Sequence, residues 1–195
     1  YCYFGFFESC YQLTTAPELP ATTLSEYCYS NMFYNCQKLT TAPILPATTL
    51  VTSCYYGMFS SCTALTTASR LPATTLAQGC YSSMFENCTS LVTAPDLPVT
   101  TLFTNCYRAM FQGCTALTTA PELPATTLAD YCYCYIFKGC TSLNYIKLNY
   151  TGNFDSLYFP TWVTNVAASG DFYYNGTDTT RGESAIPAGW TIHTF

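Results

Sequence analysis

The sequence carries very little charge, and little of that charge is positive. Only 9% of its 195 residues are Asp, Glu, Lys or Arg, against roughly 25% in an ordinary soluble protein. Six basic residues and eleven acidic residues give a net charge of −5. Nucleic acid is bound through clustered Lys and Arg side chains that neutralise phosphates, and six scattered basic residues cannot form such a cluster. We therefore expect no nucleic-acid partner.

Histidine and long apolar runs are also scarce. His193 is the only histidine and lies close to the C-terminal end, which argues against a Ser-His-Asp or Cys-His catalytic site. No apolar run approaches the ~20 residues that a membrane-spanning helix needs. We therefore expect neither an enzyme nor a membrane span, and nothing in the sequence calls for a cofactor.

The chain repeats itself every 26 residues. Six cysteines share one position of the repeat and six share a second, while segments of the type LPATTL recur at a third: Cys2, Cys28, Cys54, Cys80, Cys106 and Cys132; Cys10, Cys36, Cys62, Cys88, Cys114 and Cys140; Leu19, Leu45, Leu71, Leu97 and Leu123. Five full repeats run from Leu13 to Ser142. A fixed period of this size predicts a solenoid of stacked coils.

One repeat has three parts. The segment LTTA favours a short strand, and the two prolines of P-x-LPATTL favour an extended corner. In CYxxMFxxC, the spacing of Cys28, Met32, Phe33 and Cys36 is that of one face of a short helix. The repeat therefore predicts an α/β solenoid in which each coil has one short parallel strand, near Leu13 and its equivalents, then a proline corner and a short helix. We expect a buried core that includes Cys28, Phe33, Cys36, Leu39, Cys54, Phe59, Cys62, Leu65, Cys80, Phe85, Cys88 and Leu91.

The repeat divides the chain into a solenoid of residues 1–148 and a capping segment of residues 149–195. The second part changes composition and contains both tryptophans, Trp162 and Trp190. Terminal repeats need a cap that covers the open edge of the last coil. The chain starts within a copy of the repeat and without an initiator methionine, so we expect a processed part of a longer precursor.

The motif F-x-x-C-x-x-L, followed by a predicted short strand and in most repeats a proline, recurs along the chain. It occurs at Phe33–Cys36–Leu39, Phe59–Cys62–Leu65, Phe85–Cys88–Leu91 and Phe111–Cys114–Leu117. The motif resembles the BspA-type (Treponema pallidum type) leucine-rich repeat over residues 1 to about 148. Those repeats are shorter and have a single small residue before the Phe. The resemblance implies a bacterial cell-surface or secreted protein that acts in adhesion and carries no catalysis.

Three roles compete for the thirteen cysteines. The C-x7-C spacing and the lack of nearby histidine argue against a metal site. Two cysteines eight residues apart on a helix lie about 12 Å apart, too far for a disulfide, but bridges between neighbouring coils stay open. The remaining alternative is a column of buried free thiols that pack as small hydrophobic groups. Cys134 occupies a position expected on the outer helix face, where it is an exposed thiol or a partner of Cys132 or Cys106.

One column of the strand-corner segment varies between coils while its neighbours hardly change: Glu18, Ile44, Arg70, Asp96 and Glu122. Ile44 and Arg70 lie between Glu18 and Asp96, so we expect a solvated surface column and not the paired carboxylates of a glycosidase. We expect this column to bind a protein or glycan on a host or neighbouring cell surface. The alternative is a structural protein whose coils stack end to end, through the N-terminal end, into a fibre.

Overall fold

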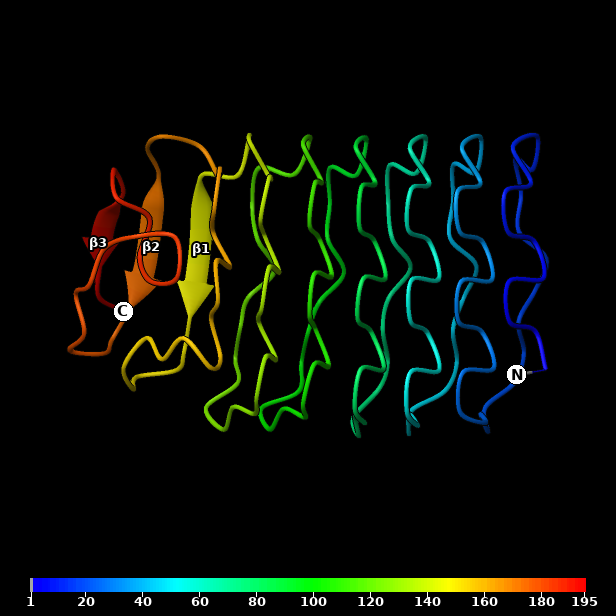
Figure 1. Ribbon diagram of the computed structural model, residues 1–195, viewed down its shortest axis with the longest axis horizontal. Helices are drawn as coiled ribbons and strands as arrows, with labels where there is room; N and C mark the ends of the chain where they lie inside the picture. Colours follow the sequence, from blue (N-terminus) through cyan, green and yellow to red (C-terminus); the bar gives the residue numbers. More distant parts are fainter. Residues whose placement is uncertain (1) are drawn as a thin grey trace.

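The computed structural model describes residues 2–195 and confirms the solenoid (Figure 1). The coils stack in sequence order from the N-terminal end to a small sheet at the C-terminal end. Parallel bridges join residues 26 positions apart, such as Thr41 with Thr67 and Thr101 with Thr127. Each repeat therefore lies on the next one in register.

Among residues 2–195, continuous strands form only at the C-terminal end of the solenoid. The strands are β1 (Tyr145–Leu148), β2 (Asp171–Tyr174) and β3 (Thr191–His193), and they pair in parallel in the order β1-β2-β3. In the preceding coils the predicted strands are reduced to isolated bridges such as Thr67–Thr93. The cause is the proline that follows LTTA in most coils, because proline lacks the N–H that a ladder needs. The segment of β1 has no proline, and there the pairing extends over four residues.

The short helix predicted for CYxxMFxxC is wrong, since residues 2–195 contain no helix. In its place, every fourth residue has a positive φ: 55° at Tyr27, 54° at Asn31 and 59° at Asn35. A left-handed residue in every turn prevents a helix from continuing. The segment is thus a run of consecutive turns with a period of four residues. That period keeps Cys28, Met32 and Cys36 on one side, so it produces the same side-chain spacing that suggested a helix.

Hydrogen bonds in this run of turns alternate strictly between local and inter-coil partners. The Met32 amide donates to the Tyr29 carbonyl within its own turn at 3.2 Å, whereas the Phe33 amide donates to the Met58 carbonyl of the next coil at 2.9 Å. Odd-numbered amides from Tyr27 to Asn35 all cross to the next coil, and even-numbered amides from 28 to 36 all stay local. Every amide of the turn run is therefore satisfied, which buried backbone requires.

Two columns of stacked aromatic rings run through the core. One contains Tyr3, Tyr29, Tyr55, Tyr81, Tyr107 and Tyr133 and ends at Phe159, and the other contains Phe7, Phe33, Phe59, Phe85, Phe111 and Phe137 and ends at Trp162. The ring centroids of Phe33 and Phe59 lie 5.6 Å apart with nearly parallel planes. Such pairs add about 0.5–1.5 kcal/mol to the burial of the rings. The twelve residues expected in the core are all buried.

The C-terminal stretch accepts the inter-coil hydrogen bonds of the last repeat, and several of its own N–H groups find acceptors within the same stretch. The amides of Tyr133 and Phe137 donate to the carbonyls of Tyr158 and Trp162 at 3.1 and 2.9 Å. The Val163 amide in turn donates to the Glu183 carbonyl, and the Trp162 indole N–H donates to the Ala185 carbonyl. The stack of turns therefore ends at residues 158–163, where some N–H groups donate to acceptors in residues 183–185. The division of the chain at residue 148 stays a prediction.

The aromatic column should dominate stability. Replacing Phe59, which is fully buried, by Ala should lower the free energy of unfolding by about 3–5 kcal/mol, because the cavity lies between two rings that cannot collapse onto each other. Urea unfolding followed by tyrosine and tryptophan fluorescence measures this change. The control Phe103→Ala removes a ring that is 45% exposed and should cost less than about 1 kcal/mol. Equal losses in the two variants would contradict the packing described.

Candidate interaction surface

The varied column lies on the surface of the strand-corner side. Its five members, Glu18, Ile44, Arg70, Asp96 and Glu122, are all exposed. Each one precedes a buried leucine of the corner, such as Leu45 after Ile44. Successive side chains of an extended segment point to opposite sides, so the leucine that enters the core turns its neighbour outward. We refer to these five residues as the varied column.

The varied column reaches the C-terminal sheet through one ion pair. Lys147 of β1 lies with its Nζ 2.9 Å from Oε1 of Glu122. Half of the Glu122 side chain is exposed, and exposed ion pairs contribute little to stability. The Lys147–Glu122 pair therefore shows mainly that the varied column continues directly into the outer face of the sheet.

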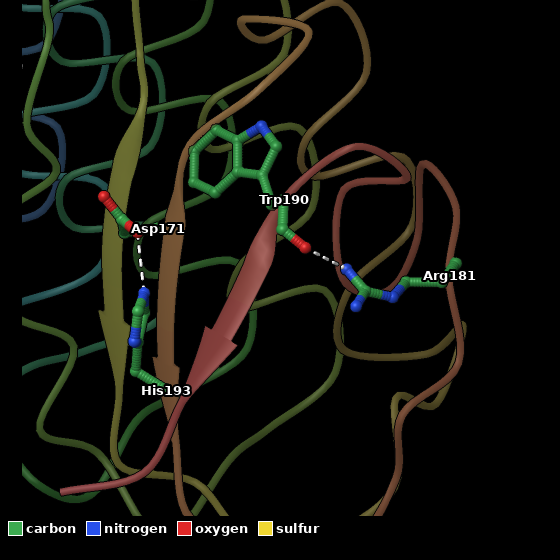
Figure 2. Close-up of polar contacts among 4 residues, drawn as sticks. All are labelled: Asp171, Arg181, Trp190 and His193. Atoms are coloured by element: carbon green, nitrogen blue, oxygen red, sulfur yellow. Dashed lines mark hydrogen bonds and ion pairs between the residues drawn. The ribbon is translucent and has the colours of Figure 1, made fainter.

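The outer face of the sheet carries a short row of rings, which the sequence did not predict. Tyr145, Tyr173 and His193 come one from each strand, with centroids 5.1 Å apart for the first pair and 4.7 Å for the second. Nε2 of His193 lies 2.6 Å from Oδ1 of Asp171 (Figure 2). The alternation in β1, where Ile146 and Leu148 are buried, was the signal that could have placed Tyr145 and Lys147 on an outer face.

The polar side chains of the C-terminal loops hold those loops in place. One guanidinium nitrogen of Arg181 donates to the carbonyl of Trp190 at 2.7 Å (Figure 2). The same nitrogen also donates to the carbonyl of Pro187 at 3.2 Å. The Asp178 carboxylate accepts hydrogen bonds from the Thr180 hydroxyl and amide and from the Phe154 amide. These bonds lower the pKa of Asp178 below its usual value. Arg181 and Asp178 are thus used by contacts within the loops.

The position of Cys134 was expected on an outer helix face, and the structure shows that this is wrong. Cys134 is 4% exposed, and the residues at the same position of earlier repeats are Ser30 (1% exposed), Tyr56 (38%), Ser82 (3%) and Arg108, which is half-buried. The reason is the absence of a helix. In the run of turns this position belongs to the inter-coil hydrogen-bonded layer, where the Ser30 carbonyl accepts the Gly5 amide at 3.0 Å. Cys134 is accordingly a buried thiol.

All thirteen cysteines are free in the structure, and only Cys2 and Cys10 are exposed. From Cys36 onward, the second cysteine of each repeat donates its thiol to a carbonyl of the previous coil, as the Cys62 thiol does to the Phe33 carbonyl at 3.1 Å. Burial raises the pKa of Cys54 and of Cys62 to about 12. Because the thiolate is the form that attacks electrophiles and binds metals, the buried cysteines act as packing groups. No cluster of potential metal ligands occurs among residues 2–195.

Comparison with known proteins gives one family. The BspA type Leucine rich repeat region matches the chain in six copies, over residues 4–118 and 80–159. Neither a curated protein nor a solved structure matches the chain. Residues 2–195 include no helix of the length and apolar character that crossing a bilayer requires.

The raised thiol pKa values predict a loss of stability at alkaline pH. A folded-state pKa above the unfolded value of about 8.5–9 means that the unfolded chain releases protons first. The contribution of each buried thiol is therefore complete below about pH 8.5 and declines toward pH 12. Each thiol changes the free energy of unfolding by about 1.4 kcal/mol per pH unit in that window. Urea unfolding in reductant should give a flat profile from pH 6 to 8 and a steep fall above pH 9; a flat profile up to pH 10.5 would contradict the burial of the thiols.

The exposure of the cysteines predicts a two-step labelling pattern. A maleimide added to the folded protein, without reductant, should modify Cys2 and Cys10 rapidly and leave the eleven buried thiols unmodified. The same reagent in urea should then modify all thirteen, because no cysteine is in a disulfide. Intact-mass measurement counts the additions. Fewer than thirteen additions in urea would show bridges between coils.

Proposed function

The chain belongs to the BspA-type leucine-rich repeat family, and from this premise we propose that it is a non-enzymatic, adhesin-like interaction module of the cell surface or of a secreted protein. Its partner is a protein or glycan on a host or neighbouring cell surface. Repeat solenoids present an extended regular face, and recognition has to come from positions that the fold leaves free. The varied column is such a set of positions.

The observation that carries this proposal is the contrast between the varied column and its neighbours. The leucines at Leu19, Leu45 and Leu71 are buried and constant, because the core accepts only one shape there. The exposed residue before each leucine changes from acid to apolar to base along the coils. Packing does not explain that variation, since none of these side chains is buried. Arg70 lies at the centre of the varied column and is its only positively charged member.

The test is a binding measurement with a charge-matched control. The double variant Arg70→Ala and Asp96→Ala removes one base and one acid from the column. It should weaken binding to a partner, identified on an array of extracellular-matrix proteins and glycans, by about tenfold, because a few central residues carry most interface energy. The control Lys38→Ala with Asp130→Ala removes the same charges from exposed sites outside the column and should change affinity less than twofold. A larger loss in the control, or no partner on the array, would contradict the proposal.

A second role would be a fibre built by end-to-end stacking of coils, and its contact would involve the N-terminal end of this chain. There Tyr3, Phe4 and Phe6 are 48%, 47% and 64% exposed. Stacking of one copy's N-terminal end on another's C-terminal end would need free donors in the last layer, and Thr161 and Val163 already donate to Ser184 and Glu183. We therefore expect monomers in negative-stain images at micromolar concentration. Filaments would establish the structural role instead.

A further inference from the structure

A cavity of about 480 Å³ opens on the corner side between the first two coils. Four prolines line it (Pro17, Pro20, Pro43 and Pro46), together with Glu18 and Ile44. Ile44 is 78% exposed, which is unusual for a large apolar side chain. We call this space the corner cavity. Its size falls within the roughly 300–1,000 Å³ of ordinary ligand pockets.

Further along the same two corners, one set of backbone hydrogen bonds is missing. Between the second and third coils, the Leu50 amide donates to the Thr75 carbonyl at 2.9 Å, and the Thr75 amide donates to the Thr48 carbonyl at 3.2 Å. At the first boundary, within residues 2–195, the equivalent Leu24 amide makes no such bond to Thr49. Within residues 2–195, no backbone hydrogen bond joins these two corners, although the run of turns joins the same two coils through bonds such as Phe7 to Met32.

The third boundary supports the link between missing bonds and open space. There too the Leu76 amide makes no corner bond to Thr101, as far as residues 2–195 show. A cavity of about 260 Å³, lined by Leu76, Pro98 and Thr101 among others, lies at that boundary. The first boundary has the larger space, and in addition it has no isolated strand bridge, whereas Thr67 and Thr93 are bridged at the third.

The lining of the corner cavity selects its occupant. Proline rings have no N–H, so the walls are apolar surface with carbonyl oxygens and few donors. A sugar needs several well-placed polar partners, and Glu18 is the only charged side chain in the lining. The Leu24 amide and the Thr49 carbonyl lie further along the two corners, outside the lining. Their equivalents at the second boundary, Leu50 and Thr75, are paired. Without that pairing, these groups suit the backbone of an extended peptide that continues along the corner from the cavity. The Glu18 carboxylate complements a base beside the inserted side chain.

We propose that the corner cavity binds one large apolar side chain of an extended partner peptide, with a Lys or Arg of that peptide next to Glu18. The inference rests on the proposed function and deepens it, because Glu18 and Ile44 are members of the varied column. It places the anchor for a protein partner at the N-terminal end of the column, while Arg70 and Asp96 contact the partner further along.

The test uses three fluorescein-labelled peptides and the full chain. Ser-Lys-Leu-Lys-Ser should bind about tenfold more tightly than Ser-Lys-Ala-Lys-Ser, because only the first fills the cavity. It should also bind more tightly than Ser-Glu-Leu-Glu-Ser, whose acids face Glu18. Fluorescence anisotropy gives the three Kd values. Equal affinity for the Leu and Ala peptides overturns the inference, as does absence of binding by the Leu peptide.

Two variants locate the site, each with a matched control. Ile44→Ala should weaken binding of the Leu peptide about fivefold, whereas Val92→Ala, also an exposed apolar residue, should leave it unchanged. Glu18→Gln should weaken it about threefold and reduce its salt dependence, whereas Asp130→Asn should do neither. Ile44 and Glu18 are exposed, so these changes leave the core intact. Unchanged affinity in both site variants overturns the inference.

The outcomes separate this inference from the proposed function. If the array partner depends on Arg70 and Asp96 but not on Ile44 and Glu18, the corner cavity is not used and the proposed function stands. If the Leu peptide requires Ile44 and Glu18 while the array yields no partner, the corner cavity is a peptide site and the broader surface role fails.

Discussion

The hydrogen bond from an amide of one coil to a carbonyl of the next is the interaction on which the rest of this structure depends. A left-handed residue at every fourth position turns alternate amides out of their own turn and toward the next coil. The resulting spacing places one aromatic ring over another, as for Phe33 and Phe59. It also places the Cys62 thiol on the Phe33 carbonyl, which already accepts the Cys36 amide. The inter-coil backbone hydrogen bonds, the ring stacking and the thiol hydrogen bonds therefore all depend on the same spacing between neighbouring coils.

Much of this could be predicted from the sequence, because the 26-residue period and the columns of Leu, Phe and Cys follow directly from which side chains recur. The helix could not be excluded in the same way, since a spacing of four suits both a helix and a run of four-residue turns. A partial signal was present: Asn31, Asn35 and Gly57 are residues that tolerate positive φ. It was hidden by Tyr27 and Ala109, which adopt positive φ without any such preference.

The candidate surface was only partly predictable, for a different reason. The exposure of the varied column follows from the alternation beside a buried leucine, which the sequence contains. The corner cavity does not, because the same LPATTL segment forms an open boundary at Leu19–Leu45 and a closed one at Leu45–Leu71. The difference lies in how the first coil sits on the second, where Leu13 and Leu24 are only half-buried. The row of rings on β1–β3 likewise depends on pairings between segments that are 26 residues apart for β1 and β2 and 20 residues apart for β2 and β3.

The central claim is that the run of turns, and not the strand-corner side, holds the coils together. Native-state hydrogen exchange tests it most directly, since exchange reports which amides are bonded and how stably. The account predicts slow exchange for both local and inter-coil amides of the turn runs, such as Met58 and Phe59 in the third coil, and fast exchange for Leu24 and Leu76 at the open corners. Faster exchange in the turn runs than at the corners would contradict it.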